Sequence, residues 1–226
     1  MEILVIAGNF SVLQNFISQL VLVENLGKNY ARFSYQEKEL DILISGTGGS
    51  VTSYFLTKSL NFKQYDFVIH LGRCFSLKDQ LESGIVVNVI DDYFGDMGFG
   101  ANESFSSVFD LGMQNKSEFP FVNEMLENNL LLPEFQSQYR KVSGISCNAI
   151  PNSLFGIANM YLKNHPDIIS RDGASVLYIC MEEKVKLLQL FYVVDRLENA
   201  SENYQIEELE VAKLTEALEV SLAQVL

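Results

Sequence analysis

Apolar runs alternate with helical patterns along this chain, and the longest run, Lys186–Arg196, has the character of a strand at the centre of a sheet. A nearly unbroken apolar run of this length is typical of a parallel strand that is buried on both faces. The run stops at Asp195. Ligands of open α/β sheets collect beyond the carboxyl ends of the strands, so Asp195 is a candidate functional residue, and a solvated strand-end carboxylate is the alternative.

Shorter apolar runs and helical patterns predict the other elements. Strands are expected at Ile3–Ala7, Tyr30–Tyr35, Asp41–Ser45, Tyr65–Leu71, Gly84–Ile90, Lys141–Ser146 and Asp167–Ser170. Helices are expected after Gly8-Asn9 with Asn9 or Ser11 as the cap, from Ser50 to Leu60, near Val122–Leu130, after Asn152, at Ser175–Glu183 and from Gln205 onward. Strands that alternate with helices predict an α/β protein, and the absence of a linker or repeat predicts one domain over 1–226.

A glycine turn, Gly46-Thr47-Gly48-Gly49-Ser50, joins a predicted strand to a predicted helix. Such a turn lets a ligand approach backbone N–H groups at a helix N-terminus. It differs from the dinucleotide fingerprint because Val51 stands in place of the third glycine, and it lacks the Lys-Ser/Thr ending of a P-loop. The turn therefore predicts a ligand site but neither NAD nor ATP.

Charge and cysteine content narrow the classes of partner. The formal net charge is −13, from 29 acidic and 16 basic residues, which argues against a protein that binds nucleic acid through its phosphates. Cys74, Cys147 and Cys180 are scattered without CxxC spacing, so neither a disulfide framework nor a zinc site is indicated. We expect no membrane-spanning segment, no signal peptide and a cytoplasmic location.

The clustered acidic residues and the two histidines have structural explanations, and the motif of another hydrolase class is absent. Asp91, Asp92 and Asp96 lie close together, but the spacing and closing Glu of an EF-hand loop are absent, so we expect a polar loop rather than a metal site. His70 and His165 fit a strand position and a helix end. No GxSxG elbow is present, and we expect no cofactor.

The order of several features along the chain resembles that of the nucleoside phosphorylase and nucleosidase superfamily. These features are a glycine turn after Ser45, a glycine turn after Leu71, the stretch VVNVIDDYFGDMG, an acid-Gly-Ala turn at 172–174 and the strand that ends in Asp195. The likeness runs through nearly the whole chain. The most specific match is Asn88–Gly98, NVIDDYFGDMG, which is similar to a segment of the futalosine hydrolase branch, a relative of methylthioadenosine/S-adenosylhomocysteine nucleosidase; Phe119-Pro120-Phe121 resembles another. The resemblance implies a three-layer αβα sandwich with a mixed central sheet, a homodimer, and cleavage of the N-glycosidic bond of a purine nucleoside.

The resemblance also implies roles for individual residues. Asp195 matches the acid that serves the purine and is the expected catalytic residue. Asp172 falls where the family has a Glu that grips the ribose hydroxyls, with Arg171 beside it. Gly46, Gly48 and Gly72 fit the glycine turns of the family. Arg73 departs from the family, which has a small residue there, and is a candidate anion ligand near these turns.

Other positions depart from the family pattern. Ser11 stands where nucleosidases carry the Glu that activates water, Phe191 replaces a strand Arg, and Val194 replaces the Ser before the purine-facing acid; Phe75 stands where the family has a Gly. Two hypotheses follow: an active nucleosidase of the futalosine hydrolase type, or a catalytically impaired relative that binds a nucleoside-like ligand or a protein partner. A pocket around Asp195 and Asp172 that is filled by Phe75, Arg73 and Phe191 favours the second hypothesis.

Overall fold

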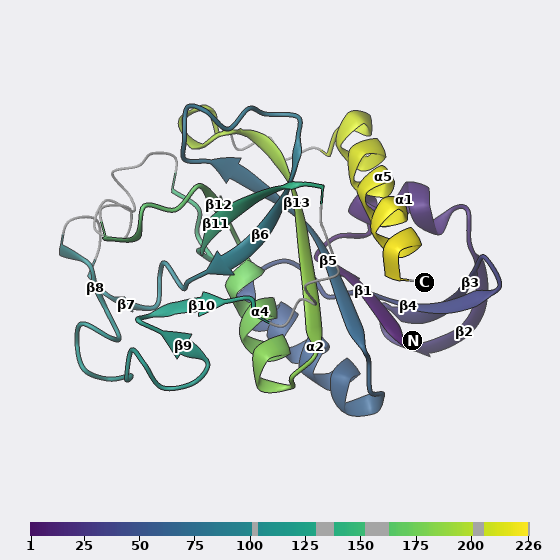
Figure 1. Cartoon of the computed structure of the whole chain (residues 1–226), viewed down its shortest axis with the longest axis horizontal. Helices are drawn as coiled ribbons and strands as arrows, with labels where there is room; N and C mark the ends of the chain where they lie inside the picture. Colours follow the sequence, from purple (N-terminus) through teal and green to yellow (C-terminus); the bar gives the residue numbers. More distant parts are fainter. Residues whose placement is uncertain (101–103, 130–137, 152–162, 201–205, 226) are drawn as a thin grey trace.

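The protein is a three-layer α/β structure, and in the part of the chain that the structure describes a mixed sheet lies between two pairs of helices (Figure 1). The computed structural model describes all residues except 101–103, 130–137, 152–162, 201–205 and 226. The helices α1 (Phe10–Ile17) and α5 (Glu208–Val225) pack together on one face of the sheet, and α2 (Gly49–Phe62) and α4 (Gly173–Glu182) pack together on the other. The predicted αβα sandwich is confirmed.

Parallel strands form the centre of the sheet. β1 (Ile3–Ala7) lies between β4 (Lys38–Ile44) and β5 (Phe67–Ser76), and β13 (Lys186–Arg196) pairs in parallel with β5. β2 (Val21–Gly27) and β3 (Tyr30–Tyr35) extend one edge in antiparallel fashion. The other side holds β12 (Ile168–Ser170), β11 (Arg140–Ser146), β6 (Val86–Asp92), β10 (Met125–Glu127) and β9 (Phe121–Val122), while β7 (Gly98–Phe99) and β8 (Ser106–Ser107) form a separate pair.

Five of these strands close into a ring. β5 pairs with β13, β13 with β6, β6 with β11, β11 with β12, and β12 returns to β5. All five contribute to one buried apolar cluster, whose members are Cys74, Leu81, Val87, Val89, Val142, Ile168, Phe191 and Val193. A Cβ on Gly72 would lie 2.6 Å from the ring of Phe191. Glycine is therefore required at position 72 because Phe191 fills the space beside it.

The central strand predicted at Lys186–Arg196 is confirmed, because β13 is buried from Leu187 to Val193 and lies between β5 and β6. Its neighbour β5 differs from expectation, because it continues through Gly72 to Ser76 instead of turning after Leu71. The extension is stabilised by pairing with β13 and with β12. The turn predicted at Gly72 is therefore wrong.

The helix predicted at Val122–Leu130 is also wrong for its described part. β9 and β10 form a hairpin there, with Asn123 at φ 52° and Glu124 at φ 75° between them. Two successive residues in the left-handed region are typical of a tight hairpin turn and interrupt a helix. The helix predicted after Asn152 lies outside the described residues. No helix of the described chain is long and apolar enough to cross a membrane.

Candidate functional site

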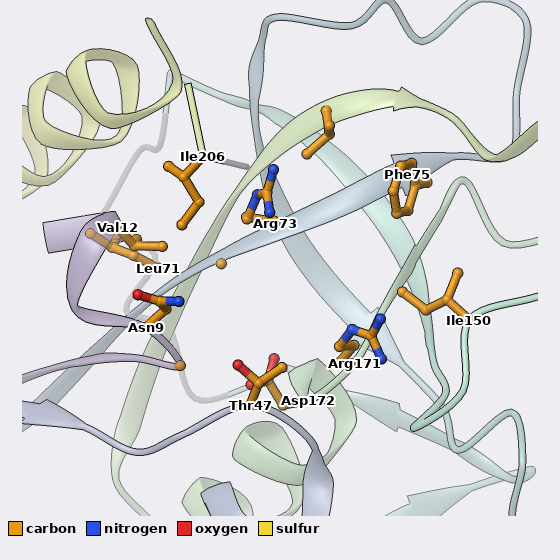
Figure 2. Close-up of a pocket in the computed structure, with 13 residues that line it drawn as sticks. Asn9, Val12, Thr47, Leu71, Arg73, Phe75, Ile150, Arg171, Asp172 and Ile206 are labelled. Carbon is orange, nitrogen blue, oxygen red and sulfur yellow. The ribbon is translucent and has the colours of Figure 1, made fainter. Parts of the chain in front are cut away.

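A pocket of about 310 Å³ opens at the carboxyl edge of the central strands (Figure 2). It is lined by residues from the turns after β1, β4 and β12, from the outer halves of β5 and β13, and from the segments that follow β11 and precede α5. This edge is where open α/β sheets bind ligands, because successive βα turns converge there. The lining residues are Gly8, Asn9, Val12, Thr47, Leu71, Gly72, Arg73, Phe75, Ile150, Arg171, Asp172, Val194 and Ile206.

Asp172 provides the only carboxylate among the described residues that line the pocket. It is 8% exposed and is the N-cap residue of α4. The Thr52 hydroxyl of α2 lies 3.3 Å from Asp172 Oδ2 and 3.1 Å from the Gly46 carbonyl oxygen, and its one proton is shared between these two acceptors. His70 Nε2 of β5 lies 3.8 Å from Asp172 Oδ1. The carboxylate is thus held between two layers of the structure with an edge toward the pocket.

Two predicted cations, Arg171 and Arg73, also line the pocket. Arg171 donates from Nη1 to the carbonyl oxygen of Asn148 over 2.8 Å. Arg73 Nε lies 2.6 Å from Oε1 of Glu210, a residue that is 1% exposed. Burial raises the pKa of Glu210, and the Arg73 guanidinium acts in the opposite direction. The Arg73–Glu210 pair therefore ties α5 to β5 at the rim of the pocket.

Gly46 and Gly48 do not line the pocket, but Thr47 between them does. Both glycines have positive φ, 84° and 100°, which lets the turn fold tightly ahead of α2. The Gly46 carbonyl accepts a hydrogen bond from Thr52, and Thr47 Oγ1 lies close to the backbone at Gly8. The two glycines therefore allow the tight turn between β4 and α2, and Thr47 is the residue of this turn that lines the pocket.

Asp195 directly follows a residue of the pocket wall but does not line the pocket itself. Val194 lines the pocket, and the pairing register of β13 shifts between Val193 and Asp195. Asp195 Oδ1 accepts hydrogen bonds from its neighbour's backbone N–H and from Asn199 Nδ2, at 2.7 and 3.0 Å. The structure therefore brings Asp172, Arg171, Gly72 and Arg73 to one pocket and leaves Asp195 beside it.

The aromatic residues do not close the pocket. Phe75 forms part of its wall, whereas Phe191 lies inside the ring of five strands and does not contribute to the lining. Ser11 is also absent from the lining; its backbone N–H instead donates to Asn9 Oδ1, which caps α1 as predicted. The pocket beside Asp172 is open.

The acidic segment at the end of β6 and just beyond it serves the scaffold. Asp92 is fully buried, and its carboxyl accepts hydrogen bonds from the Ser146 hydroxyl and the Tyr93 backbone N–H. Asp96 binds Asn148, whose Oδ1 in turn accepts from the N–H of Gly49 at the start of α2. The described part of the chain contains no group of three or more His, Cys, Asp or Glu side chains that could hold a metal ion.

Sequence reasoning missed His70 and Thr52, the two side chains next to Asp172. His70 is a polar residue that interrupts the apolar run Phe67–Leu71, and this was a usable signal. Thr52 has no comparable signal, because its meaning depends on the packing of α2 against α4.

Solved structures of other proteins have the same architecture as this chain. Campylobacter jejuni 5′-methylthioadenosine/S-adenosyl homocysteine nucleosidase is 15% identical, covers 100% of both chains and superposes with a TM-score of 0.77. The futalosine hydrolase mutant of Helicobacter pylori is 15% identical over 99% of each chain, with a TM-score of 0.78. A Helicobacter pylori nucleosidase mutant with 5′-methylthioadenosine in its active site is 13% identical, covers 99% of this chain and 98% of its own, and gives 0.79.

No family model matches this sequence, and no curated protein matches it significantly. The likeness to the solved structures therefore shows the fold, which is the nucleoside phosphorylase-like fold that the motif order predicted.

Proposed function

We propose that this chain, which has the fold of the nucleoside-cleaving nucleosidases, binds a purine nucleoside in the pocket beside Asp172 and hydrolyses its N-glycosidic bond. The observation that carries this proposal is the open pocket with one clamped carboxylate at the edge of the parallel strands. Pocket size supports it, since about 310 Å³ is within the lower range for small-molecule sites. Futalosine or a close relative is the proposed substrate, on the strength of the NVIDDYFGDMG segment.

The pocket offers different chemistry at its two ends. Asp172 can accept hydrogen bonds from the ribose hydroxyls and can stabilise positive charge that develops on the sugar as the bond breaks. Phe75, Ile150 and Val194 provide apolar surface on which a purine can stack. We therefore place the ribose next to Asp172 and the base toward these three side chains.

Protonation of the leaving purine is proposed for Asp195, the acid at the strand end. Its neighbour Val194 lines the pocket, so a small rearrangement at the register shift would bring the carboxyl to a bound base. In the present arrangement Asn199 and the Arg196 N–H occupy Asp195 Oδ1. Both bonds are made to Oδ1, so we propose that Asp195 Oδ2 carries the proton toward the purine.

A second candidate is a protein that binds the nucleoside without cleaving it. One observation favours it: among the described residues that line the pocket, Asp172 alone could act as a base, and the ribose occupies it in the proposed pose. A water nucleophile would then lack a partner to remove its proton.

Purified protein incubated with futalosine, 5′-methylthioadenosine and inosine, with and without phosphate, distinguishes these candidates. Release of free base from one nucleoside, independent of phosphate, is expected for the hydrolase. Binding by calorimetry without release would leave the second candidate, and neither binding nor release from any of the three would contradict both.

We also propose a cytoplasmic homodimer. All three cysteines are buried and free, which suits a reducing compartment. α2 exposes Val51, Tyr54 and Phe62, which are 45%, 61% and 64% exposed, and a second copy could cover this apolar face.

A further inference from the structure

A histidine is buried directly beneath the pocket carboxylate. His70 is 0% exposed, and its ring stands edge-on against Phe191 with centroids 5.0 Å apart. Its Nδ1 lies 3.0 Å from Oε1 of Gln189, the residue opposite it on β13. Its Nε2 has no hydrogen-bond partner among the described residues and lies 3.8 Å from Asp172 Oδ1. The imidazole is therefore fixed on three sides and faces one oxygen.

A hydrogen bond between His70 Nε2 and Asp172 Oδ1 requires a proton on Nε2. An unprotonated Nε2 and a carboxylate oxygen both accept hydrogen bonds, and two buried acceptors that face each other are unfavourable. If Gln189 Oε1 accepts from Nδ1, then a proton at Nε2 makes the ring an imidazolium paired with Asp172. If the amide is rotated, Gln189 Nε2, which also has no partner among the described residues, donates to Nδ1, and the neutral ring carries its proton on Nε2.

The other oxygen of Asp172 is held from the opposite side. The Thr52 hydroxyl lies 3.3 Å from Oδ2, and the backbone at Gly8 is so near that a Cβ there would lie 3.4 Å from the same oxygen. A separation of 3.8 Å is longer than a direct hydrogen bond, so a bond between His70 and Asp172 requires the carboxylate to move toward the ring. Phe191, the side chain packed against His70, is apolar and supplies no donor.

We propose that His70 is a positioning residue for Asp172: its Nε2 donates to Oδ1, Gln189 sets the protonation of the ring, and the carboxylate is thereby aimed at the ligand. The contact is a property of the folded chain. Its consequence for a ribose rests on the proposed nucleoside function.

Nitrogen-15 NMR of histidine-labelled protein tests the contact without any ligand. The chain has only two histidines, His70 and His165, so two ring systems are observed. We expect the His70 Nε2 to carry a hydrogen and Asp172→Ala to shift the His70 signals, while Asp195→Ala leaves them in place. The proposal would be overturned if His70 Nε2 carries no proton in the unmodified protein. It would also be overturned if the His70 signals do not change in a folded Asp172→Ala variant.

Calorimetry with 5′-methylthioadenosine and with adenine tests the consequence. His70→Gln should weaken binding of the nucleoside by about 10-fold, the effect of one misplaced hydrogen bond to a charged group, and leave adenine binding unchanged. Equal losses for both ligands, or no loss for the nucleoside, would refute a positioning role toward the ribose. If the unmodified protein binds neither compound, the nucleoside function fails, and the NMR experiment still decides the contact between His70 and Asp172.

Discussion

Asp92 gives a quantitative test of how the scaffold beneath the pocket is built. Its carboxyl is fully buried where β6 meets the start of α4, and Ser146, which donates to it, also accepts the N–H of Ala174. Burial raises the pKa of Asp92 well above its usual value, and the charges of Asp91 and Asp172 act in the same direction. The hydrogen bonds from Ser146 and Tyr93 oppose the shift without cancelling it.

The sign of the pH dependence follows from this shift. An unfolded chain loses the Asp92 proton near pH 3.9, whereas the folded protein keeps it to higher pH. The contribution of Asp92 to stability is therefore complete below the unfolded pKa and is lost as pH rises from there toward the folded pKa. Linkage sets the steepest slope at about 1.4 kcal/mol per pH unit for one proton.

Asp92→Asn should remove this dependence, because the amide keeps an acceptor for the Tyr93 N–H but does not ionise. Urea unfolding in steps from pH 4 to 7 gives the free energy of unfolding for both proteins. We expect the variant's stability relative to the unmodified protein to increase with pH, by up to about 1.4 kcal/mol per pH unit. Asp79→Asn is the matched control, since the Asp79 side chain is 75% exposed. A difference between Asp92→Asn and the unmodified protein that is constant with pH would refute the reasoning.

Three further predictions concern the scaffold and the assembly. Asp41→Ala should cost about 3 kcal/mol in urea unfolding, because this carboxylate is 1% exposed and binds two cations and a tyrosine hydroxyl, whereas Glu39→Ala at an exposed carboxylate should cost far less. Gly72→Ala should destabilise the protein through the close approach of Phe191, and it should cost less in a Phe191→Leu background; additive effects of the two changes would contradict the clash. Sedimentation should give about twice the 25.5 kDa chain mass, with dissociation on Tyr54→Glu, and a monomer at micromolar concentration would contradict the homodimer.

The pattern of hydrophobic and polar residues predicted the layers of this fold, because buried strands and amphipathic helices each produce a characteristic spacing of apolar residues in the sequence. It failed where the outcome depends on partners distant in sequence. β5 continues beyond Leu71 because β12 and β13 pair with it, and the segment near Val122 is a hairpin because Asn123 and Glu124 adopt left-handed conformations. Apolar spacing in so short a segment is compatible with either a helix or a hairpin.

The candidate site was predictable where residues follow strands directly. Arg171 and Asp172 come immediately after β12, and both line the pocket. The closed ring of strands could not be read from the sequence, so Gly72 was assigned to ligand approach although Phe191 is what its missing side chain accommodates. The position of the Asp195 carboxylate likewise depends on a register shift and on Asn199.

The most direct test of the account is a crystal structure with a non-hydrolysable purine nucleoside analogue. The ribose hydroxyls are expected within hydrogen-bonding distance of the Asp172 carboxylate, with the base against Phe75, Ile150 and Val194. An analogue bound with its base at Asp172, or bound away from this pocket, would contradict this expectation.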